Sequence, residues 1–312
     1  MVNKLYVAPS PHIRSKDSTQ SIMRDVLIAL IPAALVSILI FGVRALLLMV
    51  VCAGSCALFE IAYRAAMKKP STVSDLSAVV TGLILSMNLP ANLPIWMAIV
   101  GSAFSIIIVK QLFGGIGKNF ANPAIAGRIF LLMAFSGPMT SFVSSVGGAT
   151  PLSMMKTGDM ANMPSALSLL TGVQGGFFNG GIGGSMGEVC AIALLLGGCY
   201  LVYKKVITPT IPVAFIATVF VLSFVFGRNG IYDILSGGVM LGAIFMATDY
   251  TTSPTTEKGK LIFGIGCGVI TMVIRAFGAY PEGVSFAILL MNIINPHIDR
   301  MCRSKAFGGV YK

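Results

Sequence analysis

The sequence predicts an all-α polytopic membrane protein, with about ten transmembrane helices arranged as two inverted five-helix repeats with interrupted helices. The first observation is composition: 55% of the residues are apolar, 11% are charged, and the mean hydropathy is +0.87. Because a soluble domain carries about 25% charged residues, this chain lacks most of the surface that such a domain shows to water. The second observation is a series of long uncharged runs, and the third is a likeness between the two halves of the chain.

The uncharged runs set the positions of the helices. Residues 26–43 and 206–227 contain no charged side chain, and runs of about 18 or more apolar residues are typical of membrane-spanning helices. Residues 1–25 are polar and show no cleavable signal peptide, so the first run is expected to remain as a span. The predicted spans lie at 26–43, 45–63, 76–89, 94–112, 122–136, 187–203, 209–227, 231–248, 261–277 and 283–298.

The distribution of Lys and Arg predicts how these spans are oriented. With the N-terminus inside, the inner segments hold 17 of the 22 Lys and Arg residues. The outer side keeps Arg44, Lys156, Arg228 and Arg275, and Arg128 lies within the fifth span. This excess on the inner side is the positive-inside pattern. The net charge of +11 is therefore a signal of topology rather than of nucleic-acid binding, and both termini are expected in the cytoplasm.

The spans divide the chain into five segments. They are a cytoplasmic N-terminal segment (1–25), a first five-helix repeat (26–136), an outward-facing loop (137–186), a second five-helix repeat (187–298) and a cytoplasmic C-terminal tail (299–312). An odd number of spans in each half inverts the second half relative to the first. Inverted repeats with interrupted helices are typical of transporters, whose binding sites lie where the two repeats meet.

Matched stretches support the repeat. GLILSMNLPANLP in the first half and GAIFMATDYTTSP in the second each break a glycine-led apolar segment at a polar or proline turn. An Asn-Pro pair marks the fifth span of each half, at Asn122-Pro123 and Asn295-Pro296. The uncharged runs 234–248 and 261–274 are shorter than the roughly 20 residues that a crossing needs, which predicts interrupted helices there.

The six cysteines predict no disulfide framework. Cys190, Cys199 and Cys267 lie in apolar spans, as does Cys52, and a cysteine in such a span is usually a small packing residue. Cys52 and Cys56 stand four apart on one helical face and could offer two metal ligands. Because no second pair at matching spacing occurs, the packing interpretation is favoured.

The loop 137–186 is rich in Gly, Ser and Thr. Its stretch NGGIGGSMGE (179–188) does not match the dinucleotide pattern G-x-G-x-x-G, and an apolar span follows it rather than a βαβ unit. We therefore expect a hinge packed closely against neighbouring helices rather than a phosphate-binding loop.

A second stretch of this loop, SSVGGATPLSMMKTGD, contains a threonine with small neighbours. Gly147, Gly148 and Ala149 allow bulky groups to approach the backbone of Thr150. Pro151 biases Thr150 toward an extended conformation. This predicts a threonine that is presented to a modifying enzyme in an exposed, strand-like tail. On the residues alone, a plain turn remains the alternative.

The stretch VGGATPLS resembles the flavinylation motif of two related membrane proteins, the B subunit of the sodium-pumping NADH:quinone reductase and the D subunit of the Rnf complex. That motif commonly has Ser or Thr before its Ala-Thr, where this chain has Gly147 and Gly148; Thr150 and the following Pro-Leu are retained. The first span begins at Val26, without the longer N-terminal extension of the quinone-reductase subunit, so the chain is identified as a member of the Rnf D branch. Further stretches similar to that branch are SPHIRSKDST, GGIGGSMGEVCAIALLLGG, GAIFMATDYTTSP and YPEGVSFAILLMNIINP.

The resemblance implies a function. In this family a flavin transferase joins FMN through its phosphate to the threonine hydroxyl, here Thr150, and related subunits also hold a non-covalent riboflavin, whose site no local motif marks. With its partner subunits A, B, C, E and G, the complex moves electrons between ferredoxin and NAD, coupled to Na⁺ or H⁺ translocation across the bacterial cytoplasmic membrane. The chain would thus be part of a redox-driven translocase and not catalytic alone. The nicotinamide and ferredoxin sites would lie on other subunits, because no Rossmann fingerprint or cysteine cluster occurs here.

Carboxylates in or near the spans are candidates for ion movement, because such groups are costly in a bilayer. They are Glu60, Glu188, Asp233 and Asp249. Asp249 lies at a predicted helix break, where hydroxyls and freed carbonyls could join it as hard oxygen ligands, and it is the candidate cation site. A carboxylate at the inner water interface is the alternative.

The other charged residues near the spans are expected to play structural roles. Glu188 should act as a favourable charge at the N-terminus of the sixth helix. Arg128 and Arg275, near span edges, could snorkel toward the membrane surface, and pairing with a flavin or a carboxylate is the alternative. His12 and His297 are isolated in the sequence and are assigned to no site.

Two other functions fit the same chain. A stand-alone inverted-repeat transporter or channel without a redox role would need only the repeats, the broken helices and Asp249. A structural scaffold for partner subunits would need neither flavin nor ion flux. A flavin covalently bound to Thr150 distinguishes the first hypothesis from both.

Overall fold

A computed structural model describes residues 18–142, 150–158, 163–172, 182–278 and 282–303. All regular secondary structure in these ranges is helical, which confirms the predicted all-α class. The first half contains α1 (Thr19–Phe41), α2 (Val43–Ala66), the 3₁₀ turn η1 (Val73–Asp75), α3 (Ser77–Met87), α4 (Ile95–Ala103), its π-helical continuation η2 (Phe104–Gln111) and α5 (Pro123–Ala134).

Three short helices precede the second half. They are α6 (Ser136–Thr140), α7 (Pro151–Thr157) and α8 (Ala166–Thr171). The second half contains α9 (Ala191–Tyr203), α10 (Thr210–Val225), α11 (Gly230–Leu235), α12 (Val239–Leu241), the π-helical η3 (Gly242–Met246), α13 (Glu257–Phe277) and α14 (Val284–Met301).

A helix or a chain of short helices lies at each of the ten predicted spans. Among the described residues, three helices are long and apolar enough to cross a membrane: α1, α2 and α13. Several shorter apolar helices accompany them, including α3, α5 and α10. These features are those of a membrane protein, and the number of ten spans stays a prediction.

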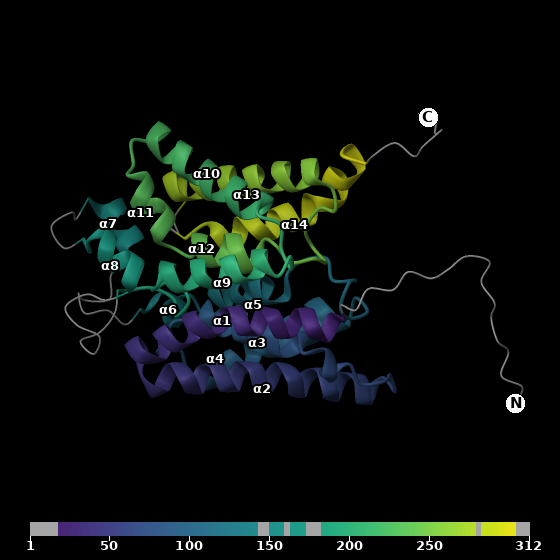
Figure 1. The fold of residues 1–312 in the computed structure, drawn as a ribbon. Coiled ribbons are helices and arrows are strands. Elements are labelled where there is room, and N and C mark those ends of the chain that lie inside the picture. The colour runs from purple at the N-terminus through teal and green to yellow at the C-terminus, as the bar shows by residue number, and fades with distance from the viewer. Residues whose placement is uncertain (1–17, 143–149, 159–162, 173–181, 279–281, 304–312) are drawn as a thin grey trace, which may run out of the picture.

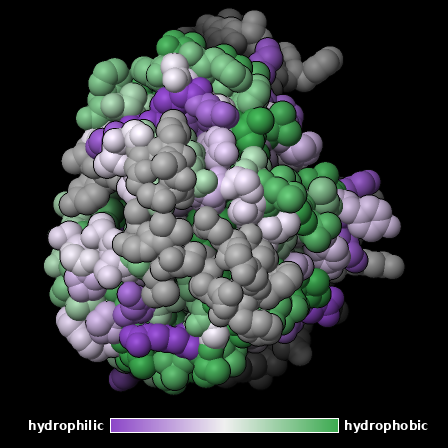
Figure 2. Space-filling view, turned by 90° about the vertical axis from the view of Figure 1, so that its left-hand side faces the viewer, coloured by the Kyte–Doolittle hydropathy of each residue, from purple (hydrophilic) through white to green (hydrophobic). Residues whose placement is uncertain are grey.

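The helices run side by side and give the molecule two distinct ends (Figure 1). The start of α1 and the end of α14 lie at one end, and α7 and α8 lie at the other. Figure 2 looks onto the α7–α8 end, where hydrophilic and intermediate side chains gather around the grey residues and hydrophobic ones lie toward the rim. We call these the terminal end and the α7–α8 end.

The predicted helix breaks are confirmed in one case and wrong in the other. The run 234–248 is interrupted, because α11 ends at Leu235 and Gly237 and Gly238 have φ of 69° and 71°, a left-handed conformation that side chains other than glycine rarely adopt. The run 261–274 belongs instead to the continuous helix α13, which extends past both ends of the run because Thr256 caps it and Glu257 begins it.

The two Asn-Pro pairs do not occupy matched places. Asn122 caps the start of α5, with Pro123 as its first residue. Asn295 and Pro296 lie well inside α14, near its C-terminal end. A proline is tolerated at the first helical position and also within apolar helices, so the same dipeptide serves two different local structures. The prediction that the two Asn-Pro pairs mark matching places is wrong, and the pairs do not support the repeat.

A close helix contact provides a test of packing. A Cβ placed on Gly82 of α3 would lie 2.6 Å from Ala53 Cα and 2.8 Å from Ala53 N of α2. We expect Gly82→Ala to lower the free energy of unfolding by about 1–3 kcal/mol, because two backbones must move apart. The measurement is a denaturant titration in mixed micelles.

The matched control lies on the facing helix. Gly54 of α2 has no atom within 4 Å of the position that a Cβ would take. Gly54→Ala should be neutral or stabilising, by up to about 1 kcal/mol, because alanine favours the helix. Equal effects of the two substitutions would contradict the close contact between α2 and α3.

Candidate functional site

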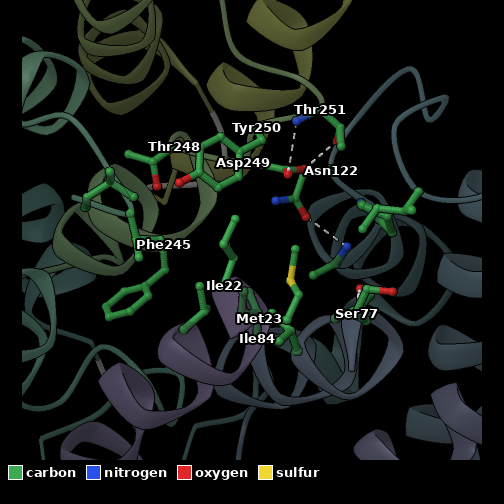
Figure 3. A pocket seen from close by; sticks show the side chains of 18 of the residues that line it. Ile22, Met23, Ser77, Ile84, Asn122, Phe245, Thr248, Asp249, Tyr250 and Thr251 are labelled. Carbon is green, nitrogen blue, oxygen red and sulfur yellow. Dashed lines mark hydrogen bonds between the residues drawn. The ribbon is translucent and has the colours of Figure 1, made fainter. Parts of the chain in front are cut away.

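A cavity opens at the terminal end of the molecule, and we call it the Asp249 cavity. It holds about 760 Å³ of empty space, counting its open mouth. Figure 3 shows apolar side chains, among them Ile22, Ile84 and Phe245, facing polar ones that include Asp249 and Asn122. An apolar wall with a few convergent polar groups is the usual form of a small-molecule site.

Asp249 lies just after η3, at the predicted helix break. Its carboxylate accepts hydrogen bonds from the Thr251 backbone N–H (3.3 Å), the Thr251 hydroxyl (3.1 Å) and the Thr252 hydroxyl (3.3 Å). The predicted hydroxyls thus surround the carboxylate. No group of three or more His, Cys, Asp or Glu that could hold a metal occurs among the residues described, so a cation at Asp249 stays a prediction.

The environment of Asp249 predicts a pH dependence. Withdrawal from water raises the pKa of this carboxyl above 3.8, and hydrogen bonds from Thr251 and Thr252 and the charge of Lys110 oppose the rise only in part. A raised folded-state pKa means that Asp249 contributes most to stability below pH 3.8, and that this contribution is lost as the pH rises through the raised value.

We expect Asp249→Asn to remove this dependence. The unfolding temperature of the variant, measured against that of the unmodified chain, should rise as the pH increases from 3.8 through the raised pKa of Asp249. Thermal unfolding in detergent at a series of pH values measures the difference. A constant difference across this range would show that the Asp249 carboxyl titrates as an ordinary exposed group does.

A buried ion pair lies beside the same cavity, and its Lys110 forms part of the wall. Lys110 Nζ, on η2, lies 2.7 Å from Glu60 Oε2 on α2 and donates to Ser77 Oγ at 2.6 Å. Thr72 donates to the other oxygen of Glu60 at 2.5 Å. Lys110 is 3% exposed and Glu60 is fully buried. The sequence places both residues near spans but does not pair them.

Thr150 lies at the opposite, α7–α8 end. It is the N-cap of α7: its backbone is extended (φ −84°, ψ 153°), as predicted, and its hydroxyl accepts a hydrogen bond from Ser153 N–H at 3.2 Å. The predicted exposed tail is not found, since Thr150 is 8% exposed. The reason is that an extended threonine before a proline is also the usual start of a helix. Residues 146–149 of the motif lie outside the described residues.

Thr150 borders a second cavity, which we call the Thr150 cavity. It holds about 780 Å³ of empty space, counting its opening. Arg128 and Glu282 supply charges, and Ser153 and Ser285 supply hydroxyls. The rest of the wall is apolar and comes from Ile129, Leu132, Met139, Phe142 and Phe286. The cavity therefore has an apolar part and a polar part, to which Thr140 and Thr150 also contribute.

Arg128 is the centre of the polar part. Its Nη1 donates to Asn88 Oδ1 (3.1 Å) and Ser285 Oγ (2.9 Å), and its Nη2 binds Glu282 and lies 3.5 Å from Glu188 Oε1. Arg128 is 4% exposed, so it does not snorkel, and the alternative of pairing with a carboxylate is confirmed. The prediction for Glu188 is wrong, because α9 begins at Ala191 and Glu188 lies buried beside Arg128.

Arg275 is buried as well, so it also pairs with a carboxylate and does not snorkel. Its Nη1 donates to Asp233 O (2.5 Å) and lies 3.4 Å from Asp233 Oδ1, and its Nη2 donates to Ser236 O (3.0 Å) and Gly237 O (3.3 Å). Arg228 forms a bidentate pair with Asp233 at 2.9 Å. Arg275 thus binds the turn that interrupts the helix between α11 and α12.

Polar residues connect the regions of the two cavities. Asn88, the C-cap of α3, donates from Nδ2 to Met246 Sδ of η3 at 3.3 Å and accepts from Arg128. Asn122, the N-cap of α5, donates to Met246 O at 3.3 Å. The ends of the two glycine-led segments therefore meet at Asn88 and Met246, between Thr150 and Asp249.

Comparison with known proteins shows similarity along nearly the whole chain. Residues 6–308 match the NQR2, RnfD, RnfE family. The chain is 49% identical to the D subunit of the Na⁺-translocating ferredoxin:NAD⁺ oxidoreductase complex of Acetobacterium woodii, covering 97% of this chain and 95% of that protein. It is 38% identical to the D subunit of the proton-translocating ferredoxin:NAD⁺ oxidoreductase complex of Clostridium ljungdahlii, covering 98% and 97%. Identity to the D subunit of an ion-translocating oxidoreductase complex of Ectopseudomonas mendocina is 35%, covering 96% and 94%.

Proposed function

Because the chain belongs to the NQR2, RnfD, RnfE family, we propose that it is the D subunit of a redox-driven translocase that passes electrons between ferredoxin and NAD and couples this transfer to Na⁺ or H⁺ movement. It works in the bacterial cytoplasmic membrane with subunits A, B, C, E and G, which hold the ferredoxin and nicotinamide sites. The chain itself supplies the membrane path and covalently bound FMN.

The packing of the helices supports ten spans in two inverted repeats. The first helices of the halves, α1 and α9, pack on each other, and so do the fifth, α5 and α14. In each half, a buried cation on the fourth span binds the start of the third: Lys110 binds Ser77, and Arg275 binds Asp233. With both termini in the cytoplasm, the Asp249 cavity faces inward and the Thr150 cavity faces outward.

The observation that carries the flavin proposal is the place of Thr150 at the edge of an amphipathic cavity. A flavin has a flat ring system with polar edges, and the residues fit it. Ile129, Leu132 and Phe286 offer apolar surface to the ring, and the Ser285 hydroxyl, which accepts from Arg128, offers a donor to its carbonyl edge. Bound FMN supplies the electron chemistry, and the protein holds and orients it. The phosphate is joined to Thr150 Oγ1 by a flavin transferase.

The test is a set of Thr150 variants made together with the transferase. Thr150→Asn keeps an N-cap side chain for α7 but has no hydroxyl for a phosphoester. We expect it to fold and to lose the flavin that otherwise remains on the polypeptide in denaturing electrophoresis. Thr157→Ala, at the other end of α7, should keep the flavin fully.

Flavin retained by Thr150→Asn would overturn this attachment site. A chain that carries no covalent flavin, when the transferase is active on a control protein, would favour the stand-alone transporter. Mass spectrometry of the peptide that contains Thr150 distinguishes attachment there from attachment at a neighbouring hydroxyl.

The Asp249 cavity is our proposed place for the second, non-covalent riboflavin. Ile84 and Phe245 give apolar walls, and Asn122, Ser77 and Thr248 give hydrogen-bonding groups to a flavin edge. Asp249, which lines the same cavity, is the proposed inward cation site. Electrons and the ion would then be handled by adjoining groups, which favours coupling between them.

A further inference from the structure

The Glu188 side chain lies in a narrow cavity beneath Thr150 that is separate from the Asp249 cavity. Its side chain is 7% exposed, and its Oε1 has no hydrogen-bond donor among the described residues. Arg128 Nη2 lies 3.5 Å away, an ion pair beyond good hydrogen-bond distance. The walls of the cavity are formed by Thr150, Pro151, Leu152, Leu169, Ile182, Gly183, Gly184, Val189, Leu235, Ser236, Gly237 and Glu282.

Arg128 does not neutralise Glu188 fully. Its Nη1 is used by Asn88 and Ser285, and its Nη2 binds Glu282 directly. Arg128 Nη2 therefore faces two carboxylates, and Glu188 Oε1 is left with only the longer of the two contacts and no hydrogen-bond donor among the described residues. A buried carboxylate without full compensation is unfavourable unless a further cation or donor reaches it.

The other arginines nearby make their direct contacts elsewhere, and Arg275 adds its charge to Glu188 and Glu282 only from beyond ion-pair distance. Arg275 and Arg228 both bind Asp233. Arg275 Nη2 also binds the carbonyls of Ser236 and Gly237, so these two oxygens already have a donor. The oxygens left for a ligand are the Glu188 carboxylate, Glu282 and the backbone of the adjoining glycines.

Glycine allows the backbone to approach this carboxylate. A Cβ on Gly238 would lie 3.0 Å from Glu188 Oε1, and a Cβ on Gly184 would lie 3.2 Å from Glu188 Oε2. Any larger residue would crowd the carboxylate and the space beside it. Hard cations prefer carboxylate and carbonyl oxygens, which are the groups gathered here.

We propose that Glu188 and Glu282 form an outward cation site that binds a sodium ion beside the flavin anchor. Its role in ion movement rests on the proposed function, and the relative that is 49% identical is named as Na⁺-translocating. Electrons taken up by a flavin on Thr150 bring negative charge next to this site. Sodium binding and flavin reduction then favour each other by the same factor.

The first test reads sodium binding without flavin. The Thr150→Asn chain, purified without the transferase, is unfolded thermally in NaCl and in choline chloride of equal ionic strength. A ligand that binds only the folded state raises the unfolding temperature. Asp249→Asn is added to remove the inward site. We expect sodium, but not choline, to raise the unfolding temperature of the Thr150→Asn, Asp249→Asn chain. This rise should be lost when Glu188→Gln is also present.

Two further variants make this result decisive. Glu188→Asp keeps the charge but shortens the side chain, and should weaken the sodium response without abolishing it. Glu257→Gln, at an exposed pair with Lys260, should leave the response unchanged. A sodium response that persists in Glu188→Gln, or that is absent while Glu188 is intact, overturns the site. A response to pH but not to sodium also overturns it and identifies Glu188 as a proton-binding group.

The second test uses the flavin-loaded chain. We expect sodium to shift the midpoint potential of the covalent flavin upward, and Glu188→Gln to remove that shift while the flavin stays attached. If Thr150 carries no flavin, only this second measurement is lost, and the proposed function fails without the cation site failing. A sodium-dependent potential that survives in Glu188→Gln counts against the site.

Discussion

Lys110→Met is expected to lower the free energy of unfolding by about 3–5 kcal/mol, because it leaves the fully buried Glu60 carboxylate without its cation. Methionine has a similar length, so the loss reflects charge more than volume. Thr72 still donates to one Glu60 oxygen, but Glu60 Oε2 and Ser77 Oγ both lose their contact with the ammonium group. Denaturant titration of the purified chain in mixed micelles measures the change.

The double variant Glu60→Gln with Lys110→Met separates charge from packing. With both charges removed it should recover most of the loss, since replacing a whole buried pair is close to neutral. Lys260→Met breaks a pair whose Glu257 side chain is 63% exposed, and should leave the free energy of unfolding nearly unchanged because water screens such a pair. A double variant as unstable as Lys110→Met would show that the pair is not the cause.

Lys110→Met should also affect the proposed inward cation site at Asp249. Lys110 lines the Asp249 cavity, and its charge lowers the pKa of Asp249. Without Lys110 the pKa of Asp249 should rise further. The pH at which a cation displaces the proton from Asp249 should rise with it, and a sodium titration at several pH values reads this shift.

The sequence predicts the helical class and the helix positions because both follow from local composition. An apolar run folds as a helix wherever backbone polar groups cannot reach water. The break after α11 is also local, because Gly237 and Gly238 take up a left-handed conformation. The prediction for 261–274 fails because an uncharged run was equated with a helix, whereas Thr256 and Glu257 begin α13 earlier.

The charged site is not predictable in this way. Arg128 binds Asn88, Glu188, and the pair Glu282 and Ser285, which come from three separate segments of the chain. Taken alone, each of these residues fits an ordinary local role. An arginine near the edge of a span, for example, can snorkel toward the membrane surface. Only the fold shows that the charges meet away from water. Thr150 is only partly predictable from the sequence. The motif identifies the residue, but its burial depends on the packing of α7.

Arg275→Met is the second substitution for which we expect a loss of about 3–5 kcal/mol. Arg275 is 1% exposed, and its guanidinium binds Asp233, Ser236 O and Gly237 O. Removing it leaves backbone carbonyls at the helix break without a donor, while Asp233 keeps Arg228. Arg275→Lys should recover only part of the loss, because an ammonium group lacks the planar fork that reaches several acceptors at once. Arg300→Met, at an exposed arginine, should cost less than about 0.5 kcal/mol.

The helix break that Arg275 holds also packs against the helix that begins after Thr150. A Cβ on Gly237 would lie 2.7 Å from Arg275 Nη2 and would also collide with Leu152 of α7, so the turn, the arginine and α7 are in close contact. If the turn moves, α7 and the Thr150 hydroxyl move with it. We therefore expect Arg275→Met to lower the fraction of chains that carry flavin, even at a temperature where the protein stays folded. Full flavin loading in a folded Arg275→Met protein would show that the turn and the attachment site are independent, and that Arg275 serves stability alone.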